Sequence, residues 1–132
     1  YRKINVRQQE DDPDSLLSLY RDLVHLRQNH EALRVGSWTL IQANSTRLDT
    51  FLRQTENESI IVVINMNRNA VGAENYSLEL DEGSLEGAVT AVSLYGAELT
   101  GSPTINTSGG FTGYTPFDEI PPQSVHIIQL VP

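Results

Sequence analysis

The sequence contains no cysteine, and Lys3 is the single lysine among its 132 residues. Without thiols the chain can form no disulfide, no thiolate nucleophile and no zinc–thiolate site. Nine basic residues against 17 acidic ones give a formal net charge of −8, with no basic stripe along the chain. Because nucleic-acid binding depends on neutralising phosphates, this charge pattern excludes a nucleic-acid partner.

Long hydrophobic runs are also missing. No stretch approaches the roughly 20 apolar residues of a membrane span, and no signal peptide opens the sequence, so no membrane partner is expected. The compartment stays open between cytoplasmic and secreted. The first residue is Tyr1 rather than Met, which suits an excised or processed fragment. What is present, 39% hydrophobic and 20% charged residues, is typical of one globular domain with an appended helix.

A helix is predicted over residues 13–29. Asp12 can cap it, Pro13 suits its first turn, and acidic residues match the positive end of the helix dipole. Gly36 is expected to end the helical region soon after Leu33. Apolar residues recur at helical spacing and cover more than one side of the helix: Leu16, Leu17, Leu19, Tyr20, Leu23, Val24 and Leu26.

From residue 37 onward the apolar period changes to two, which is typical of strands. The continuous run at residues 60–64 predicts a strand that is buried on both faces. Further strands are expected near residues 38–41, 48–52, 76–80, 89–94 and 124–130. Short strands separated by turn signals predict a mainly β fold, an antiparallel Greek-key β-sandwich preceded by one N-terminal α-helix.

An acidic cluster precedes the predicted helix, formed by Glu10, Asp11, Asp12 and Asp14. A calcium loop needs alternating ligands around a glycine turn, which is missing here, so helix capping is the better interpretation. Further carboxylates are spread over the strand region, and nothing singles out a pair suited to glycoside hydrolysis.

The histidines suggest no metal site. His25 and His30 are five residues apart and do not share a helical face, while His126 lies within a predicted strand. We interpret all three as surface or structural residues. Nucleophilic catalysis is disfavoured because the sequence has no Gly-x-Ser-x-Gly elbow.

Three aromatic residues, Phe111, Tyr114 and Phe117, occur in a stretch flanked by glycine and proline, which predicts a loop. They are the best local candidates for carbohydrate or partner contact, since loops carry function and rings stack on sugars. The alternative, that these rings belong to the core, stays open at this point.

Several stretches form a recognisable series along the chain. They are Asn5-Val6, the helix with Ser15-Leu16-Leu17, Tyr20-Arg21 and Leu26-Arg27, its exit Ala32-Leu33 to Gly36, the strand end Ile64-Asn65-Met66-Asn67, and the turn Pro121-Pro122-Gln123-Ser124-Val125. In this order they resemble the C-terminal part of the α-amylase superfamily, glycoside hydrolase family 13, and its α-glucosidase and oligo-1,6-glucosidase-like branch. Residues 82–115 match least and are expected to hold an extra loop or hairpin.

This resemblance implies a parent enzyme with a (β/α)8 barrel that acts on starch or maltooligosaccharides with retention. The family's catalytic carboxylates precede the position matching Tyr1, so no catalytic residue, metal ligand or cofactor site is assigned to this chain. Residues 1–36 would be the last barrel helix with its lead-in, and residues 37–132 the amylase-type C-terminal β-sandwich.

The resemblance also implies a non-catalytic role, packing on the barrel of the same parent chain and stabilising it. The barrel-facing helix residues would be Leu16, Leu19, Tyr20 and Leu23. The alternatives are a carbohydrate-binding module that contacts α-glucans through exposed aromatics, or an independent enzyme. Because the helix is apolar on more than one side, the isolated chain is expected to self-associate or to hold its helix loosely.

Overall fold

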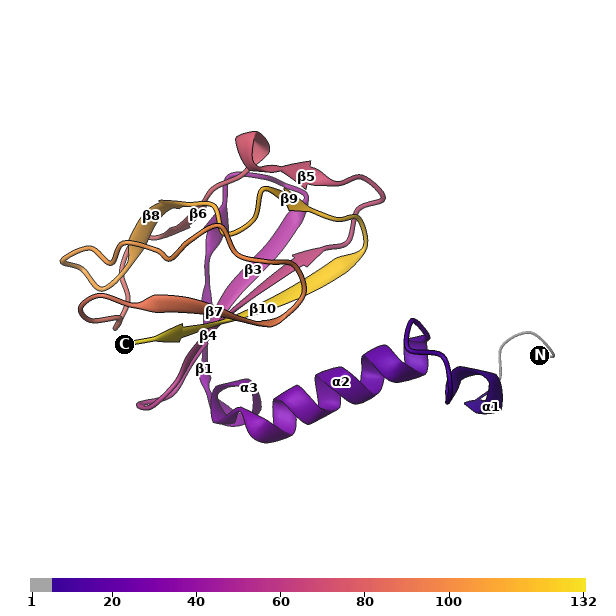
Figure 1. The fold of residues 1–132 in the computed structure, drawn as a ribbon. Helices are drawn as coiled ribbons and strands as arrows, with labels where there is room; N and C mark the ends of the chain where they lie inside the picture. Colours follow the sequence, from indigo (N-terminus) through magenta and orange to yellow (C-terminus); the bar gives the residue numbers. More distant parts are fainter. Residues whose placement is uncertain (1–5) are drawn as a thin grey trace.

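The computed structural model describes residues 6–132, which form three helices followed by a two-layered set of strands. Residues 1–5, which include the start of the family-like lead-in, lie outside the described part. The helices are α1 (Val6–Gln9), α2 (Leu16–Asn29) and α3 (Glu31–Val35). Figure 1 shows α2 beneath the strands, with α1 beyond its amino-terminal end.

The predicted helix is confirmed, but it begins at Leu16 rather than residue 13. Its cap is Ser15, whose Oγ accepts a hydrogen bond from the Ser18 N–H at 3.2 Å. Asp12 is committed to a turn instead, because its Oδ1 accepts from the Asp14 N–H at 3.0 Å. Capping by Asp12 was therefore wrong, and the serine one position before Leu16 takes that role.

Gly36 follows α3, as expected, but its conformation is ordinary, with φ at −61°. Glycine is needed here for space. A Cβ on Gly36 would lie 2.5 Å from the Ala32 carbonyl oxygen and 2.9 Å from the Gln54 backbone nitrogen. At this helix-to-strand junction the backbone of Gly36 therefore lies too close to the backbones of Ala32 and Gln54 for any residue with a side chain.

The larger sheet has five antiparallel strands in the order β1-β3-β4-β10-β7. Their bounds are β1 (Ser37–Leu40), β3 (Leu48–Gln54), β4 (Ser59–Asn65), β7 (Thr90–Tyr95) and β10 (Ser124–Val131). The second layer combines a three-stranded sheet in the order β2-β6-β8 with the β5-β9 pair. Its elements are β2 (Gln42–Ala43), β5 (Val71–Gly72), a 3-10 turn (Ala73–Asn75), β6 (Leu78–Leu80), β8 (Phe111–Tyr114) and β9 (Glu119–Ile120).

The main core lies between the two layers, and a second core lies on the outer face of the five-stranded sheet. Strand β4 serves both, as its unbroken apolar run predicted: Ile61 and Val63 face the inner core, while Ile60 and Val62 face the helices. All four side chains are buried. The predicted mainly β antiparallel sandwich with helical lead-in is confirmed.

Residues 82–115 are an integral part of the sandwich, through hydrogen bonds, strand pairing and a buried side chain. The backbone N–H of Gly83 donates to the Ser108 carbonyl at 3.0 Å, and that of Leu85 donates to Gly109 at 3.2 Å. Strand β7, within this segment, pairs with β10, and Leu85 is buried in the inner core. The stretch expected as an extra loop or hairpin therefore contributes the edge strands β7 and β8 of the two layers, and part of the core (Figure 1).

Candidate functional site

Helix α2 presents two apolar faces to different surroundings. Leu23 and Leu26 pack on the outer core of the five-stranded sheet, together with Ala32 of α3. By contrast Leu16 is 73% exposed and Tyr20 is 67% exposed. The four residues predicted to face a barrel therefore do not share one environment. Leu23 packs on the sandwich of its own chain, whereas Leu16 and Tyr20 stay exposed.

The fourth of those residues, Leu19, lines a groove of about 700 Å³ between the amino-terminal half of α2 and the sheet. The opposite walls come from the end of β4 and the start of β10, including Ile64, Met66 and Val125. Most lining side chains are apolar. Leu16, Tyr20 and this groove form what we call the docking surface, and its composition suits a protein partner.

Glu58, in the turn before β4, fixes the other end of α2 to the sandwich. Its carboxylate accepts from His30 Nδ1 at 2.5 Å and from the Ala32 N–H at 2.9 Å. Gln129 of β10 donates to it at 3.3 Å. A negative charge at the first turn of α3 is favourable, and the contact joins the α2–α3 elbow to two central strands. We call this group the Glu58 clamp.

His126 lies on the groove wall but is only 2% exposed. Its Nδ1 accepts from the Ala97 N–H at 3.0 Å, so the ring proton resides on Nε2, 2.9 Å from Ser124 Oγ. That hydroxyl in turn donates to the Pro121 carbonyl at 2.6 Å. Burial lowers the pKa of His126, which keeps the ring neutral.

This serine–histidine pair has the wrong polarity for nucleophilic catalysis. A general base must accept the serine proton on Nε2, whereas here Nε2 donates to Ser124 and the serine proton points to a carbonyl. The chain of hydrogen bonds instead ties the end of β7 to the start of β10. His126 therefore fits the structural interpretation given to it from the sequence.

Asn65 has a structural role at the end of β4, in the family-like stretch Ile64-Asn65-Met66-Asn67. It is buried, and its Nδ2 lies within 3.0–3.3 Å of the carbonyl oxygens of Asn69, Ile120 and Pro121. Its Oδ1 accepts from the Asn67 N–H at 3.0 Å. A buried side chain that both donates and accepts is required at this corner, and asparagine meets that need. Asn65 thereby shapes the rim on which exposed Met66 stands.

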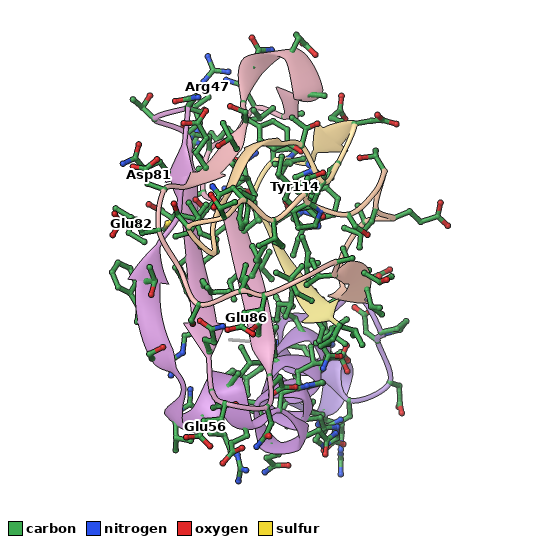
Figure 2. The ribbon with its side chains drawn as sticks, turned by 90° about the vertical axis from the view of Figure 1, so that its left-hand side faces the viewer. Arg47, Glu56, Asp81, Glu82, Glu86 and Tyr114 are labelled. Carbon is green, nitrogen blue, oxygen red and sulfur yellow. The ribbon has the colours of Figure 1, made fainter. Side chains whose placement is uncertain are left out.

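The aromatic candidates are buried, which corrects their predicted placement in an accessible loop. Phe111 and Tyr114 belong to β8, and with Phe117 they lie in the inner core. Residues three apart on a regular strand face opposite sides, but the ladder with β6 shifts register here and Gly113 adopts a φ of +67°. Both rings therefore turn inward, and Figure 2 shows Tyr114 among the side chains of the sandwich. Phe111, Tyr114 and Phe117 therefore offer no ring face to a sugar.

Charged residues form no further site within the described residues. Glu56, Asp81, Glu82 and Glu86 are exposed along one side of the sandwich in Figure 2. Across residues 6–132, no group of three or more histidine, aspartate or glutamate side chains is arranged to hold a metal ion. None of the described helices combines the length and hydropathy needed to cross a bilayer.

β1 carries an exposed apolar patch, whose exposure the sequence did not indicate. Trp38 is 57% exposed and its ring centroid lies 6.1 Å from that of Phe51, with Leu40 also exposed next to it. These side chains extend the outer face of the five-stranded sheet beyond the area that the helices cover. Strand alternation alone could not reveal this, because it does not tell which sheet face is capped by α2 and α3.

Comparison with known proteins relates the sequence to carbohydrate-active enzymes. No family model matches the chain. It is 33% identical over 82 residues to an oligo-1,6-glucosidase of Bacillus cereus, covering 62% of this chain and 14% of that protein. It is 38% identical over 69 residues to a trehalose synthase of Thermus thermophilus, covering 52% and 7% respectively. The chain thus spans a small part of these relatives.

Solved structures share the fold over nearly the whole chain. A trehalose-6-phosphate hydrolase of Bacillus licheniformis aligns with a TM-score of 0.64 and 22% identity, covering 100% of this chain and 21% of the other. An isomaltulose synthase variant of Erwinia rhapontici NX5 in complex with D-glucose gives a TM-score of 0.63, 21% identity, and 100% and 21% coverage. By sequence and fold, this chain is similar to the C-terminal region of enzymes of the α-amylase family, glycoside hydrolase family 13, in agreement with the resemblance carried by its sequence motifs.

Proposed function

We propose that this chain is the non-catalytic C-terminal domain of a retaining α-glycoside hydrolase that acts on starch or maltooligosaccharides. In this proposal residues 1–36 supply the last helix of the catalytic (β/α)8 barrel and residues 37–132 the β-sandwich. The domain packs on the barrel and stabilises it. The observation that carries the proposal is the pair of apolar faces on α2, of which one is already packed.

The exposed face has the properties of a docking surface. Leu16 and Tyr20 lie one helical turn apart, and the apolar groove opens beside Leu19. Burying a large apolar side chain contributes roughly 1.5–3 kcal/mol, so a barrel that covers Leu16 and Tyr20 would be bound with a substantial favourable free energy. The Glu58 clamp supports the same role, because it fixes the direction in which α2 leaves the sandwich.

A non-catalytic role is supported by the side chains that the chain carries. Retaining hydrolysis needs two carboxyl groups held about 5 Å apart across a bound sugar. A second groove, of about 700 Å³, lies between the turn before β4 and residues 84–86, and its acidic side chains are Glu56, Glu58 and Glu86. Of these, Glu56 and Glu86 are exposed, while Glu58 is held in its clamp. The family resemblance assigns the reacting carboxylates to the part of the parent that precedes Tyr1.

The test combines this chain with the upstream catalytic region of its parent, produced separately. We expect the two to co-elute, and the melting temperature of the catalytic region to rise when the chain is added. Tyr20→Glu should abolish both effects. His25→Glu, an equal charge change at an exposed position on the far side of α2, should leave both intact.

Two results would contradict the proposal. One is release of chromophore from an α-glucoside by this chain alone. The other is the absence of any binding or stabilisation when the two parts are mixed while each part is folded by circular dichroism.

A further inference from the structure

Besides the phenol of Tyr95, four polar side chains line the apolar groove, and three of them are bonded within the chain. Asn65, Ser124 and His126 each form hydrogen bonds with backbone groups at 2.6–3.3 Å. The fourth is Gln123, whose side chain is exposed. Within residues 6–132 its amide forms no hydrogen bond. Of the two side-chain amides that line the groove, that of Gln123 is therefore the one free to bind a partner.

The backbone of Gln123 adopts a conformation that a side chain makes unfavourable. Its φ is +49°, and among residues 6–132 it alone has a positive φ without being glycine. Glycine adopts this region without steric cost. The N–H of Gln123 donates to the Asn67 carbonyl at 3.0 Å, which joins the start of β10 to the end of β4. The turn thus uses the backbone of this residue, while no hydrogen bond of its side chain within the described residues offsets the strain.

We propose that Gln123 is the residue through which the docking surface forms hydrogen bonds with the backbone of the catalytic region. This inference rests on the proposed function and names one contact residue of the same surface. A glutamine amide matches a peptide group, because each both donates and accepts hydrogen bonds. Met66, which is 73% exposed, lines the same groove and is covered by the same docked segment.

The occupant is assigned to the catalytic region by two observations. The solved trehalose-6-phosphate hydrolase matches this whole chain with 21% of its own length, so most of that protein lies outside the region that resembles this chain. The groove itself is mainly apolar, and permanent interfaces are more apolar than transient ones. Apolar contact has little directional preference. A free amide in such a groove therefore fixes the position of the docked segment.

The test measures the affinity of the whole chain for the separately produced catalytic region. Gln123→Gly removes the side chain and suits a φ of +49°, so the chain alone should melt at the same temperature or higher. Its affinity should nevertheless fall about five- to tenfold, as expected for the loss of a neutral hydrogen bond. Gln123→Glu removes the N–H donors with little change of shape and should also bind more weakly. Gln42→Glu, the same charge change at an exposed glutamine of β2, should bind as the unmodified chain does.

A second measurement follows the side-chain amide directly. In the ¹⁵N spectrum of the chain, the NH₂ signal of Gln123 is the one that disappears in Gln123→Glu. This signal should shift, and its hydrogen exchange should slow, when the catalytic region is added. The NH₂ signal of Gln42 should do neither.

Failure of this inference is distinguishable from failure of the proposed function. If the unmodified chain does not bind the folded catalytic region, both are overturned. If it binds and folded Gln123→Gly binds equally well, the inference alone is overturned. A fall of more than about 4 °C in the melting temperature of isolated Gln123→Gly also overturns it, because the side chain then serves the fold. So does tighter binding of Gln123→Glu, because the group it meets is then basic.

Discussion

Replacing Glu58 by alanine should free the helices from the sandwich while the sandwich stays folded. The substitution removes the acceptor for His30 Nδ1 and for the Ala32 N–H, and it removes the contact of Gln129. Hydrogen bonds to a charged group are worth about 1.5–3 kcal/mol each, but they are not additive and the carboxylate is still 12% exposed. We therefore expect a loss of about 2 kcal/mol in the free energy that holds the helices in place.

Native-state hydrogen exchange measures this loss segment by segment. A change of about 2 kcal/mol corresponds to roughly a 30-fold faster exchange of the amides of α2 and α3. Amides of β4 and β10 should keep their protection, because their ladder does not involve the Glu58 side chain. Glu58→Gln should give a smaller effect, since the amide oxygen can still accept from Ala32.

The control is Glu56→Ala, which removes an exposed carboxylate from the same turn and should change neither set of amides (Figure 2). The reasoning is refuted if the helices of folded Glu58→Ala exchange at the unmodified rate. It is equally refuted if helices and sandwich lose protection together, because the clamp would then be part of global stability rather than a local attachment.

Three further outcomes follow from buried groups. Because burial lowers the pKa of His126, the unfolded state takes up a proton on this residue first as the pH falls below 6.5. The free energy of unfolding should therefore drop by up to about 1.4 kcal/mol per pH unit. Denaturant titrations at several pH values would detect this slope, which His126→Asn should reduce. Burial raises the pKa of Tyr76 to about 12 and also raises the pKa of Tyr114. The stability that these neutral tyrosines contribute below pH 10 should therefore be lost between pH 10 and 12. The prediction is contradicted if the tyrosinate absorbance of all five tyrosines rises together near pH 10 while the protein is folded. Gly110→Ala places a Cβ 1.8 Å from a carbonyl oxygen of β6 and should cost at least about 2–3 kcal/mol by denaturant midpoint, whereas Gly101→Ala, with no atom within 4 Å, should cost less than about 0.5 kcal/mol.

The fold was largely predictable because its signals are local. The apolar run at residues 60–64 predicted a strand buried on both faces, and β4 is buried on both of its faces. The helix was found from its spacing, but its first turn was misplaced because Asp12 and Ser15 are both good caps, and the competing turn at Asp14 decides between them.

The site was less predictable, because its contacts join residues far apart in sequence. Glu58 meets His30 across 28 positions and Gln129 across 71, and no periodicity encodes such pairings. Phe111 and Tyr114 were misplaced for a related reason. Their common inward direction depends on a register shift against β6, which appears only when the partner strand is known.

The position of β10 has a consequence for the order of folding. It follows every other described strand along the chain, yet it lies between β4 and β7 rather than at an edge. During synthesis β7 can therefore not join the sheet until Ser124–Val131 has left the ribosome, although β1, β3 and β4 can pair as soon as they emerge. The sheet face on which α2 packs is thus completed by the last of the described strands to be made, and removing that strand would open the centre of the sheet instead of shortening its edge.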